Sequence, residues 1–378
     1  MLSCGEPSGD LYAGALAAEI LKLEPDAIVT GFGGERMQAG GATLVRDFRG
    51  LSVTGLSEAL HVIPKSWQTY RALVRAADVD PPDVFVPIDF PDFNAFLTRA
   101  LHARGVPVVY YISPQLWAWR AGRIKTVRRV ADRVLVIFPF EVPFYERANV
   151  PVTFVGHPLL ELTPSTPPRD VFLRQHGLDP ARPVVAILPG SRSNELRMIL
   201  PDLVRAAAII AAKIPGAQFL LARAPHLDDR LLEPLATWPS GITPPVVVER
   251  LTDEVLASAD VALVASGTVT VQAALHTCPM VVVYRVAPMT YRLGKGLLQV
   301  DTYAMVNLVA GRRVVPELIQ DDFTPEATAQ HALDVLSDPA YAARVRSELA
   351  AVRASLGTEG ASRRAAEAII DVARRRKR

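Results

Sequence analysis

Short runs of apolar, mostly β-branched residues alternate along this chain with segments of helical periodicity, and polar turns join the two. The clearest run, residues 84–88, ends at Asp89 and leads into residues 95–101, whose apolar positions have helical spacing. A parallel strand must be followed by a long crossover, which is usually a helix. The alternation therefore predicts an α/β fold with parallel sheets covered by helices.

The length of the chain, 378 residues, predicts two domains, because a single domain usually has roughly 100–200 residues. We place the boundary in the proline-rich stretch 162–168, which has no periodicity. The first domain would span residues 1–162 and the second residues 163–357. The last helix, about residues 358–378, could pack back on the first domain.

Composition excludes several classes of protein. A formal charge of +2 gives no support to nucleic-acid binding, although residues 374–378 are strongly basic. Cys4 and Cys278 are too few for a disulfide framework or a zinc site, and they favour a reducing cytoplasm. No uncharged apolar run reaches the ~18–20 residues that a membrane-spanning helix needs, so any membrane contact should be peripheral.

Asp89 lies at the carboxyl end of a predicted strand, where open parallel sheets bind their ligands. It is therefore our candidate for a catalytic base. Carboxylates are also favoured in the first turn of a helix, so Asp89 and Asp92 could instead serve the helix that follows. A metal site on this pair is disfavoured, because the helical position already accounts for Asp92.

Two more turns in the first half follow predicted strands. Residues 5–10 (Gly-Glu-Pro-Ser-Gly-Asp) could offer amides to an anion or a sugar hydroxyl, or they could form an ordinary capped turn. Trp117, Trp119 and Arg120 would suit a sugar or an acyl chain, unless the rings pack beneath their loop. His157 is a weak catalytic candidate, since a lone histidine beside a proline is more often structural.

The second half contains two turns suited to phosphate. In residues 189–195, Gly190 permits a tight turn, Ser191 offers donors at a helix start and Arg192 adds a fixed charge. Together they predict a diphosphate cradle, although an ordinary structural turn is the alternative. It is not a Walker loop, because the Gly-Lys-Ser/Thr ending is missing. Residues 266–268 again place amides at a helix start, and two such turns suggest a nucleotide.

Residues 55–70 are apolar and contain a tryptophan. With Lys65 beside them, Val62, Ile63 and Trp67 could lie in a membrane surface. The alternative is a core helix broken at Pro64.

Six motifs, in order, resemble the lipid-A-disaccharide synthase family. They are GEPSGD (5–10), IDFPDFN (88–94), SPQLWAWR (113–120), LPGSR (188–192), ASGT (265–268) and NLVAG (307–311). The resemblance covers nearly the whole chain. It implies a GT-B glycosyltransferase, in which two Rossmann-like parallel-sheet domains face a cleft.

The activity implied by the resemblance joins UDP-2,3-diacylglucosamine to 2,3-diacylglucosamine 1-phosphate (lipid X) through a β-1,6 linkage and releases UDP. An inverting transfer needs a base for the acceptor 6-hydroxyl and positive groups for the diphosphate. Because an arginine and helix N-termini can carry the charge of the leaving group, no metal or other cofactor is required. The family's setting implies a cytoplasmic enzyme, peripheral on the anionic inner face of the inner membrane of Gram-negative bacteria. Two copies of the chain could pair as a homodimer.

Carried over residue by residue, the resemblance makes Asp89 the base, Arg192 the diphosphate arginine, and Glu6 or Asp10 the acceptor-side acid. Gln272 stands where many members have a ribose-binding glutamate, and we expect altered nucleotide affinity without loss of activity. The full predicted site comprises acceptor-side Glu6, Ser8, Asp10, Trp117 and Arg120; UDP-binding Gly190, Ser191, Arg192, Ser266, Gly267, Thr268, Gln272, Asn307 and Glu317; and membrane-contacting Val62, Ile63 and Trp67.

Two other functions remain open from the sequence. A UDP-sugar 2-epimerase-like isomerase shares the two-domain architecture but would bind no lipid, so the apolar stretch 55–70 discriminates against it. In a non-catalytic nucleotide-sugar or lipid-binding protein, Asp89 would be dispensable.

Overall fold

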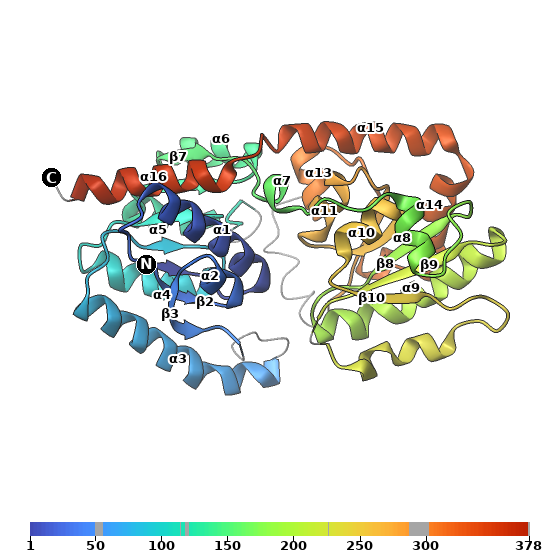
Figure 1. Ribbon diagram of the computed structural model, residues 1–378, viewed down its shortest axis with the longest axis horizontal. Coiled ribbons are helices and arrows are strands. Elements are labelled where there is room, and N and C mark those ends of the chain that lie inside the picture. Colours follow the sequence, from blue (N-terminus) through green and yellow to red (C-terminus); the bar gives the residue numbers. More distant parts are fainter. Residues whose placement is uncertain (50–55, 114, 118–120, 226, 287–301, 377–378) are drawn as a thin grey trace. The chain divides into compact units, whose positions relative to one another are not determined.

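The structure, a computed structural model, describes residues 1–49, 56–113, 115–117, 121–225, 227–286 and 302–376 (Figure 1). The chain forms two compact units. Unit 1 comprises Met1–Glu161 together with Leu356–Arg378, and unit 2 comprises Leu162–Ser355. Each unit is a parallel sheet covered by helices, so the α/β prediction is confirmed.

The sheet of unit 1 has the order β3-β2-β1-β4, followed by β5-β6-β7. Parallel single bridges, Phe85 with Val108 and Ile88 with Tyr111, link β4 to β5. The strands are β1 (Leu2–Ser3), β2 (Thr30–Gly33), β3 (Thr43–Asp47), β4 (Val86–Pro87), β5 (Val109–Tyr111), β6 (Arg133–Val136) and β7 (Val152–Phe154). The helices are α1 (Pro7–Leu23), α2 (Glu35–Ala39), α3 (Leu56–Val79), α4 (Pro91–His102), α5 (Ile124–Val130), α6 (Val142–Arg147), α7 (Leu159–Leu162, at the boundary) and α16 (Ala361–Arg376), with 3-10 turns η1 (Ala121–Arg123) and η2 (Pro139–Glu141).

Unit 2 has a six-stranded parallel sheet of order β10-β9-β8-β11-β12-β13. The strands are β8 (Val184–Leu188), β9 (Gln218–Arg223), β10 (Val246–Glu249), β11 (Val261–Ala265), β12 (Met280–Tyr284) and β13 (Glu317–Ile319). The helices are α8 (Arg169–Gln175), α9 (Ser193–Lys213), α10 (Thr252–Ser258), α11 (Val269–Leu275), α13 (Met305–Ala310), α14 (Pro325–Ser337) and α15 (Pro339–Ser355), with 3-10 turns η3 (Asp229–Thr237) and η5 (Gln320–Asp322).

Both faces of the unit 2 sheet are buried, which explains the uninterrupted apolar strands. Successive side chains of a strand point to opposite faces. In β8, Val184 and Ala186 pack in one apolar cluster, whereas Val185 and Ile187 pack in another on the opposite face. The helical layers on the two faces bury these clusters.

In each sheet the strand order reverses beside the first strand. The reversal lies between β1 and β4 in unit 1, and between β8 and β11 in unit 2. The carboxyl edge of an open parallel sheet binds ligands at such a switch point. In unit 1 this point carries residues 4–10 and Asp89, and in unit 2 it carries residues 189–195 and 266–268.

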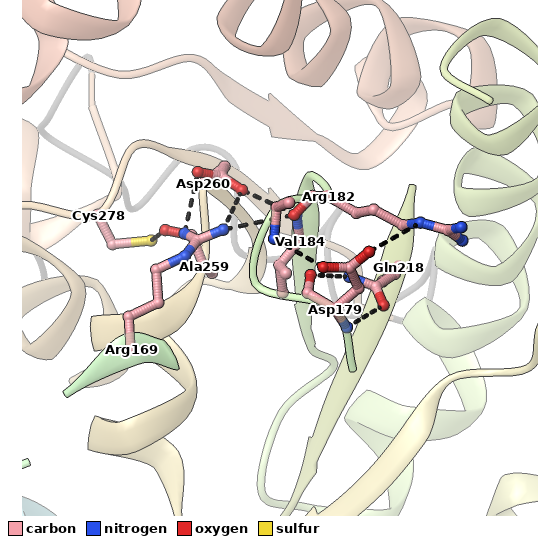
Figure 2. A network of polar contacts seen from close by, with 9 residues as sticks. Arg169, Asp179, Arg182, Val184, Gln218, Ala259, Asp260 and Cys278 are labelled. Atoms are coloured by element: carbon pink, nitrogen blue, oxygen red, sulfur yellow. Dashed lines mark hydrogen bonds and ion pairs between the residues drawn. The ribbon is translucent and has the colours of Figure 1, made fainter. Parts of the chain in front are cut away.

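The opposite, amino edge of the unit 2 sheet is closed by a network of polar contacts (Figure 2). Asp260, just before β11, accepts hydrogen bonds from the Arg169 guanidinium at 2.9 and 3.0 Å and from the Val184 amide at 2.8 Å. Gln218 and the backbone of Asp179 exchange two hydrogen bonds of 2.8 Å. These contacts fix where β8, β9 and β11 begin. They thereby help to position the turns 189–195 and 266–268, which follow the opposite ends of β8 and β11.

The second strand differs from its prediction. The apolar run 27–30, followed by the glycine-rich residues 31–34, predicts a strand over residues 27–30 and a turn that begins at Gly31, but β2 is Thr30–Gly33. At Gly31, φ is 153° and an added methyl group would overlap the carbonyl of Leu2 in the neighbouring β1. The glycine therefore belongs to the strand, because it lets two strands approach closely.

Candidate active site

The turn that carries Asp89 has a strained backbone. Asp89 and Phe90 both adopt left-handed conformations, with φ of 46° and 50°, and so does the β-branched Ile112 after β5, at 55°. Such a conformation costs a non-glycine residue roughly 1–2 kcal/mol. Strain of this kind persists only where the surroundings fix it, and it clusters at functional sites. The Ile112 carbonyl supports the turn by accepting the Asp89 amide at 3.2 Å.

Two further contacts hold the same turn. The side-chain amide of Asn94, in the first turn of α4, donates to the Asp89 carbonyl at 2.7 Å. A methyl group on Gly5 would overlap the Phe90 ring, so the ring lies directly on the glycine backbone. Cys4 is buried nearby, and its pKa is raised by burial and then by the Asp10 and Asp89 carboxylates. Ser3 of β1 pairs with Pro87 of β4, so Asp89 lies close to the end of β1.

Asp10, predicted on the acceptor side, has a structural position. Its carboxylate accepts the backbone amides of Gly34 at 2.7 Å, Arg36 at 2.9 Å and Met37 at 3.1 Å. These bonds satisfy the free amides at the start of α2, and Asp10 is 4% exposed. Glu6 is the residue before α1 and Ser8 lies in the first turn of that helix, both half-buried at the same edge as Asp89.

The loop after β5 is held by the buried side chain of Glu141. Glu141 is buried at 3% exposure, accepts the Phe138 amide at 3.1 Å and accepts the indole N–H of Trp117 at 3.3 Å. Burial raises the pKa of Glu141 to about 7. Ser113 bonds to the hydroxyl of Tyr145. Trp117 is thus held in place by a buried carboxyl group, and Arg120 lies outside the described residues.

His157 is structural. It is 1% exposed, and its Nδ1 accepts the Leu159 amide at 3.2 Å. Burial lowers its pKa to about 3, so the ring stays neutral near pH 7. Its ring is nearly perpendicular to that of Tyr12 in α1, with the ring centroids 6.1 Å apart.

In unit 2, the predicted diphosphate turn is occupied by a carboxylate of the same chain. Gly190 has φ of 119°, which favours glycine. Glu195, in the first turn of α9, accepts the amides of Ser191 at 2.9 Å and Arg192 at 3.2 Å. Its other oxygen pairs with the Arg192 guanidinium at 3.2 Å. A carboxylate therefore already satisfies the donors expected to hold phosphate.

The second predicted turn follows β11. Ser266 is half-buried, and Gly267 and Thr268 are exposed just before α11. One turn into α11, the Gln272 amide lies 3.4–3.5 Å from the carboxylate of Asp253. Asp253 also bonds to His276 at 2.9 Å. A glutamate at position 272 would meet the like charge of Asp253, whereas glutamine can donate to it.

Asn307 and Glu317 hold their own loop together. Asn307 is fully buried, accepts the amides of Val314 and Val315, and donates to the Val315 carbonyl at 2.9 Å and to Glu317 at 2.6 Å. Glu317 also accepts the Tyr303 amide at 2.8 Å. Because these bonds use all the hydrogen-bonding capacity of the Asn307 amide, its predicted UDP role would act through the shape of the loop.

The apolar stretch forms the first part of α3, and the helix runs through Pro64 without ending there. Ile63 and Trp67 are 60% and 58% exposed, so they do not belong to the core. The side chain of Val62 lies outside the described residues. Among the helices that the structure describes, none is long and apolar enough to cross a bilayer.

The basic residues at the chain's end are paired where they are described. Arg374 pairs with Glu24, and Arg375 pairs with Asp371 at 2.7 Å. In the described part of the chain, no three His, Cys, Asp or Glu side chains gather as metal ligands would.

Three residues of this site have no role predicted from the sequence: Asn94 in the motif 88–94, Glu195 in the turn 189–195, and Glu141, which lies outside every motif. Glu195 had a local signal, because an acidic residue three positions after a turn can return to cap it. Glu141 has the same local signal toward the Phe138 amide, three positions earlier. Its bond to Trp117 and the bond of Asn94 to Ser3 have none, since these partners are remote in sequence.

Comparison with known proteins gives consistent matches. The family model described as lipid-A-disaccharide synthetase matches residues 1–370. The chain is 44% identical over 375 residues to a lipid-A-disaccharide synthase of Geobacter sulfurreducens, covering 98% of this chain and 96% of the relative. It is 42% identical over 372 residues to one of Myxococcus xanthus, covering 98% and 97%.

Solved structures share the fold at low identity. A UDP-GlcNAc 2-epimerase from Neisseria meningitidis, bound to UDP-GlcNAc, has a TM-score of 0.66 at 13% identity and covers 98% of both chains. The calicheamicin glycosyltransferase CalG4 has a TM-score of 0.59 at 19% identity, covering 99% of this chain and 97% of its own. The fold is thus that of GT-B glycosyltransferases and these epimerases.

Proposed function

This chain belongs to the lipid-A-disaccharide synthase family, and we propose that it transfers a 2,3-diacylglucosamine residue from UDP to the 6-hydroxyl of 2,3-diacylglucosamine 1-phosphate. The observation that carries this proposal is the Asp89 turn. A carboxylate at the switch point of a parallel sheet, on a strained backbone, is suited to act as a positioned base.

The reaction needs one proton acceptor and one stabilised leaving group. Asp89 takes the proton of the acceptor 6-hydroxyl while that oxygen bonds to C1 of the donor sugar. The bond from C1 to the diphosphate oxygen breaks, and UDP leaves with the electron pair. Attack on the face opposite UDP inverts C1 and gives the β-1,6 linkage.

The leaving diphosphate would bind the turn 190–192 of unit 2. The Arg192 guanidinium and the amides at the start of α9 stabilise negative charge there. Glu195 now accepts two of those amides, so UDP binding requires its carboxylate to move aside. Gln272, with its amide near Asp253, would meet the ribose.

The acceptor side would be formed by unit 1. Glu6 and Ser8 lie at the start of α1, and Trp117 is fixed by Glu141. Asp10 would contribute indirectly, by fixing the start of α2. An indole ring and polar helix-start groups together suit an acylated sugar.

The test measures UDP release from both acylated sugars, with each omitted in turn. Asp89→Asn should slow turnover by about 10²–10⁴-fold, the usual share of general-base catalysis, and should leave the UDP dissociation constant nearly unchanged. Asp92→Asn is the matched control, because its exposed carboxylate pairs with Arg123 at 3.1 Å. Normal turnover of Asp89→Asn would contradict the assignment. UDP-GlcNAc epimerisation without an acceptor would instead support an isomerase.

We also propose that the first part of α3 contacts the membrane surface on which the acylated substrates lie. The exposed Ile63 and Trp67, with Lys65 on the same segment, support this. Apolar burial would persist in high salt, whereas lysine attraction to anionic lipid, about 1 kcal/mol per residue, would be screened.

Replacing Val62, Ile63 and Trp67 together with serine should reduce co-sedimentation with anionic liposomes and leave the melting temperature nearly unchanged. Val79→Ser is the matched control, because Val79 is 86% exposed at the far end of the same helix. A triple variant that melts much lower and still sediments would show that these side chains stabilise the fold and do not bind lipid.

A further inference from the structure

We propose that Asn94 is a positioning residue for the Asp89 base, because its buried side chain fixes the backbone turn from which the carboxylate projects. This inference rests on the proposed function of Asp89. Asn94 bonds to the carbonyl of Asp89 and does not need to touch the substrate.

The contacts of Asn94 use both ends of its amide. The nitrogen donates to the Asp89 carbonyl at 2.7 Å and to the Ser3 carbonyl at 3.1 Å. The oxygen accepts the Ser3 hydroxyl at 2.6 Å. Asn94 is 1% exposed and Ser3 is fully buried, so water does not compete for the two bonds between them. The amide thus joins the end of β1 to the end of β4, across the switch point.

The chemistry of this position selects asparagine. The site presents two carbonyl acceptors on one side and a hydroxyl donor on the other, and an amide matches both. Aspartate has the same shape but would direct an oxygen at the two carbonyls, and its charge would be buried. Alanine would leave the buried Ser3 hydroxyl without its acceptor and would remove a donor from the Asp89 carbonyl.

Loss of the Asn94 contacts should slow the reaction by moving the Asp89 side chain. Asp89 and Phe90 are both left-handed, a conformation that relaxes when its supports are removed. Relaxation would redirect the Asp89 side chain, and a displacement of about 1 Å can cost about 10²-fold in rate. Because the diphosphate turn belongs to unit 2, UDP affinity should not change.

A double-mutant cycle tests the inference. Asn94→Ala alone should lower kcat by up to about 10²-fold, with the acceptor KM and the UDP dissociation constant within about twofold. In an Asp89→Asn background, the same change should lower the residual rate by less than about threefold, because residues that act as a unit are not additive. Thr98→Ala, equally buried in α4, is the matched control for general destabilisation.

Ser3→Ala provides a milder variant that keeps Asn94 and removes only the bond to its oxygen. It should lower kcat several-fold in the parent and leave the Asp89→Asn rate unchanged. This variant decides the matter if Asn94→Ala does not fold.

Each outcome separates this inference from the proposed function. Equal losses in both backgrounds, or a kcat loss matched by Thr98→Ala, would overturn the positioning role while Asp89 remains the base. Full activity of both Asn94→Ala and Ser3→Ala would do the same. Normal turnover of Asp89→Asn alone would instead remove the proposed base.

Discussion

Replacing Glu141 by glutamine should remove a loss of stability that unit 1 undergoes as the pH rises through 7. Burial raises the pKa of this carboxyl group from 4.5 to about 7 in the folded chain. The folded state therefore holds the proton more tightly than the unfolded state. Stability from this group is fully present below pH 4.5 and is lost as pH rises through 7. A glutamine side chain does not titrate in this pH range, so the variant should not show this loss.

The size of the effect follows from the shift. One pKa unit corresponds to about 1.36 kcal/mol, so a shift to about 7 destabilises the ionised form by about 3 kcal/mol. Between pH 5 and pH 8, the free energy of unfolding of Glu141→Gln should rise by about 2.5 kcal/mol relative to the parent. Imperfect bonds to Phe138 and Trp117 would lower the variant's stability by about 1–3 kcal/mol at every pH and leave this slope intact.

Chemical denaturation at successive pH values, followed by tryptophan fluorescence, measures this difference. Glu146→Gln is the control, since Glu146 is exposed in the adjoining α6. A difference between Glu141→Gln and its parent that stays constant from pH 5 to pH 8 would refute the reasoning. It would mean that the Glu141 carboxyl group is exposed to water and is not buried against Trp117.

Three other predictions concern one turn in each unit. Arg192→Ala should weaken UDP binding by about 1.5–3 kcal/mol, the range for hydrogen bonds to charged groups, whereas Glu195→Gln should tighten it by up to about 1 kcal/mol, because a competing charge and a partly exposed ion pair are removed. Calorimetry with UDP checks both, and weaker binding by Glu195→Gln would show that the carboxylate preorganises the turn. Gly5→Ala should lower stability by about 1–3 kcal/mol, because its methyl group overlaps the Phe90 ring. Thermal denaturation measures this loss, and an unchanged melting temperature would mean that the ring can move aside freely.

The α/β fold could be predicted because its main signals are local. Strands buried on both faces are continuous apolar runs, and β8 is one in which every residue is buried. The bounds of β2 could not be predicted. Gly31 belongs to the strand because a side chain there would overlap Leu2, a residue of another strand. A glycine in a close strand pair and a glycine in a turn look alike in a sequence.

The site was predictable at the level of its turns and less so for individual side chains. The position of Asp89 at a strand end follows from pattern alone. The tasks of Asp10 and Asn307 depend on backbone groups brought near by folding, such as the Gly34 amide, and no spacing rule reveals them. A polar residue in a loop motif can serve a ligand or the loop itself, and only its contacts distinguish the two.

The path of the chain has a consequence for synthesis. Glu161 accepts the amides of Gly360 and Ser362 at the start of α16, and Arg364 donates to the Val155 carbonyl, so α16, beside α1 in Figure 1, completes unit 1. Unit 2 is thus an uninterrupted insertion. On the ribosome, residues 162–355 can fold as soon as they emerge, whereas unit 1 is complete only once the residues of α16 have been made. A chain released before α16 would leave the unit that carries Asp89 unfinished, although it is made first.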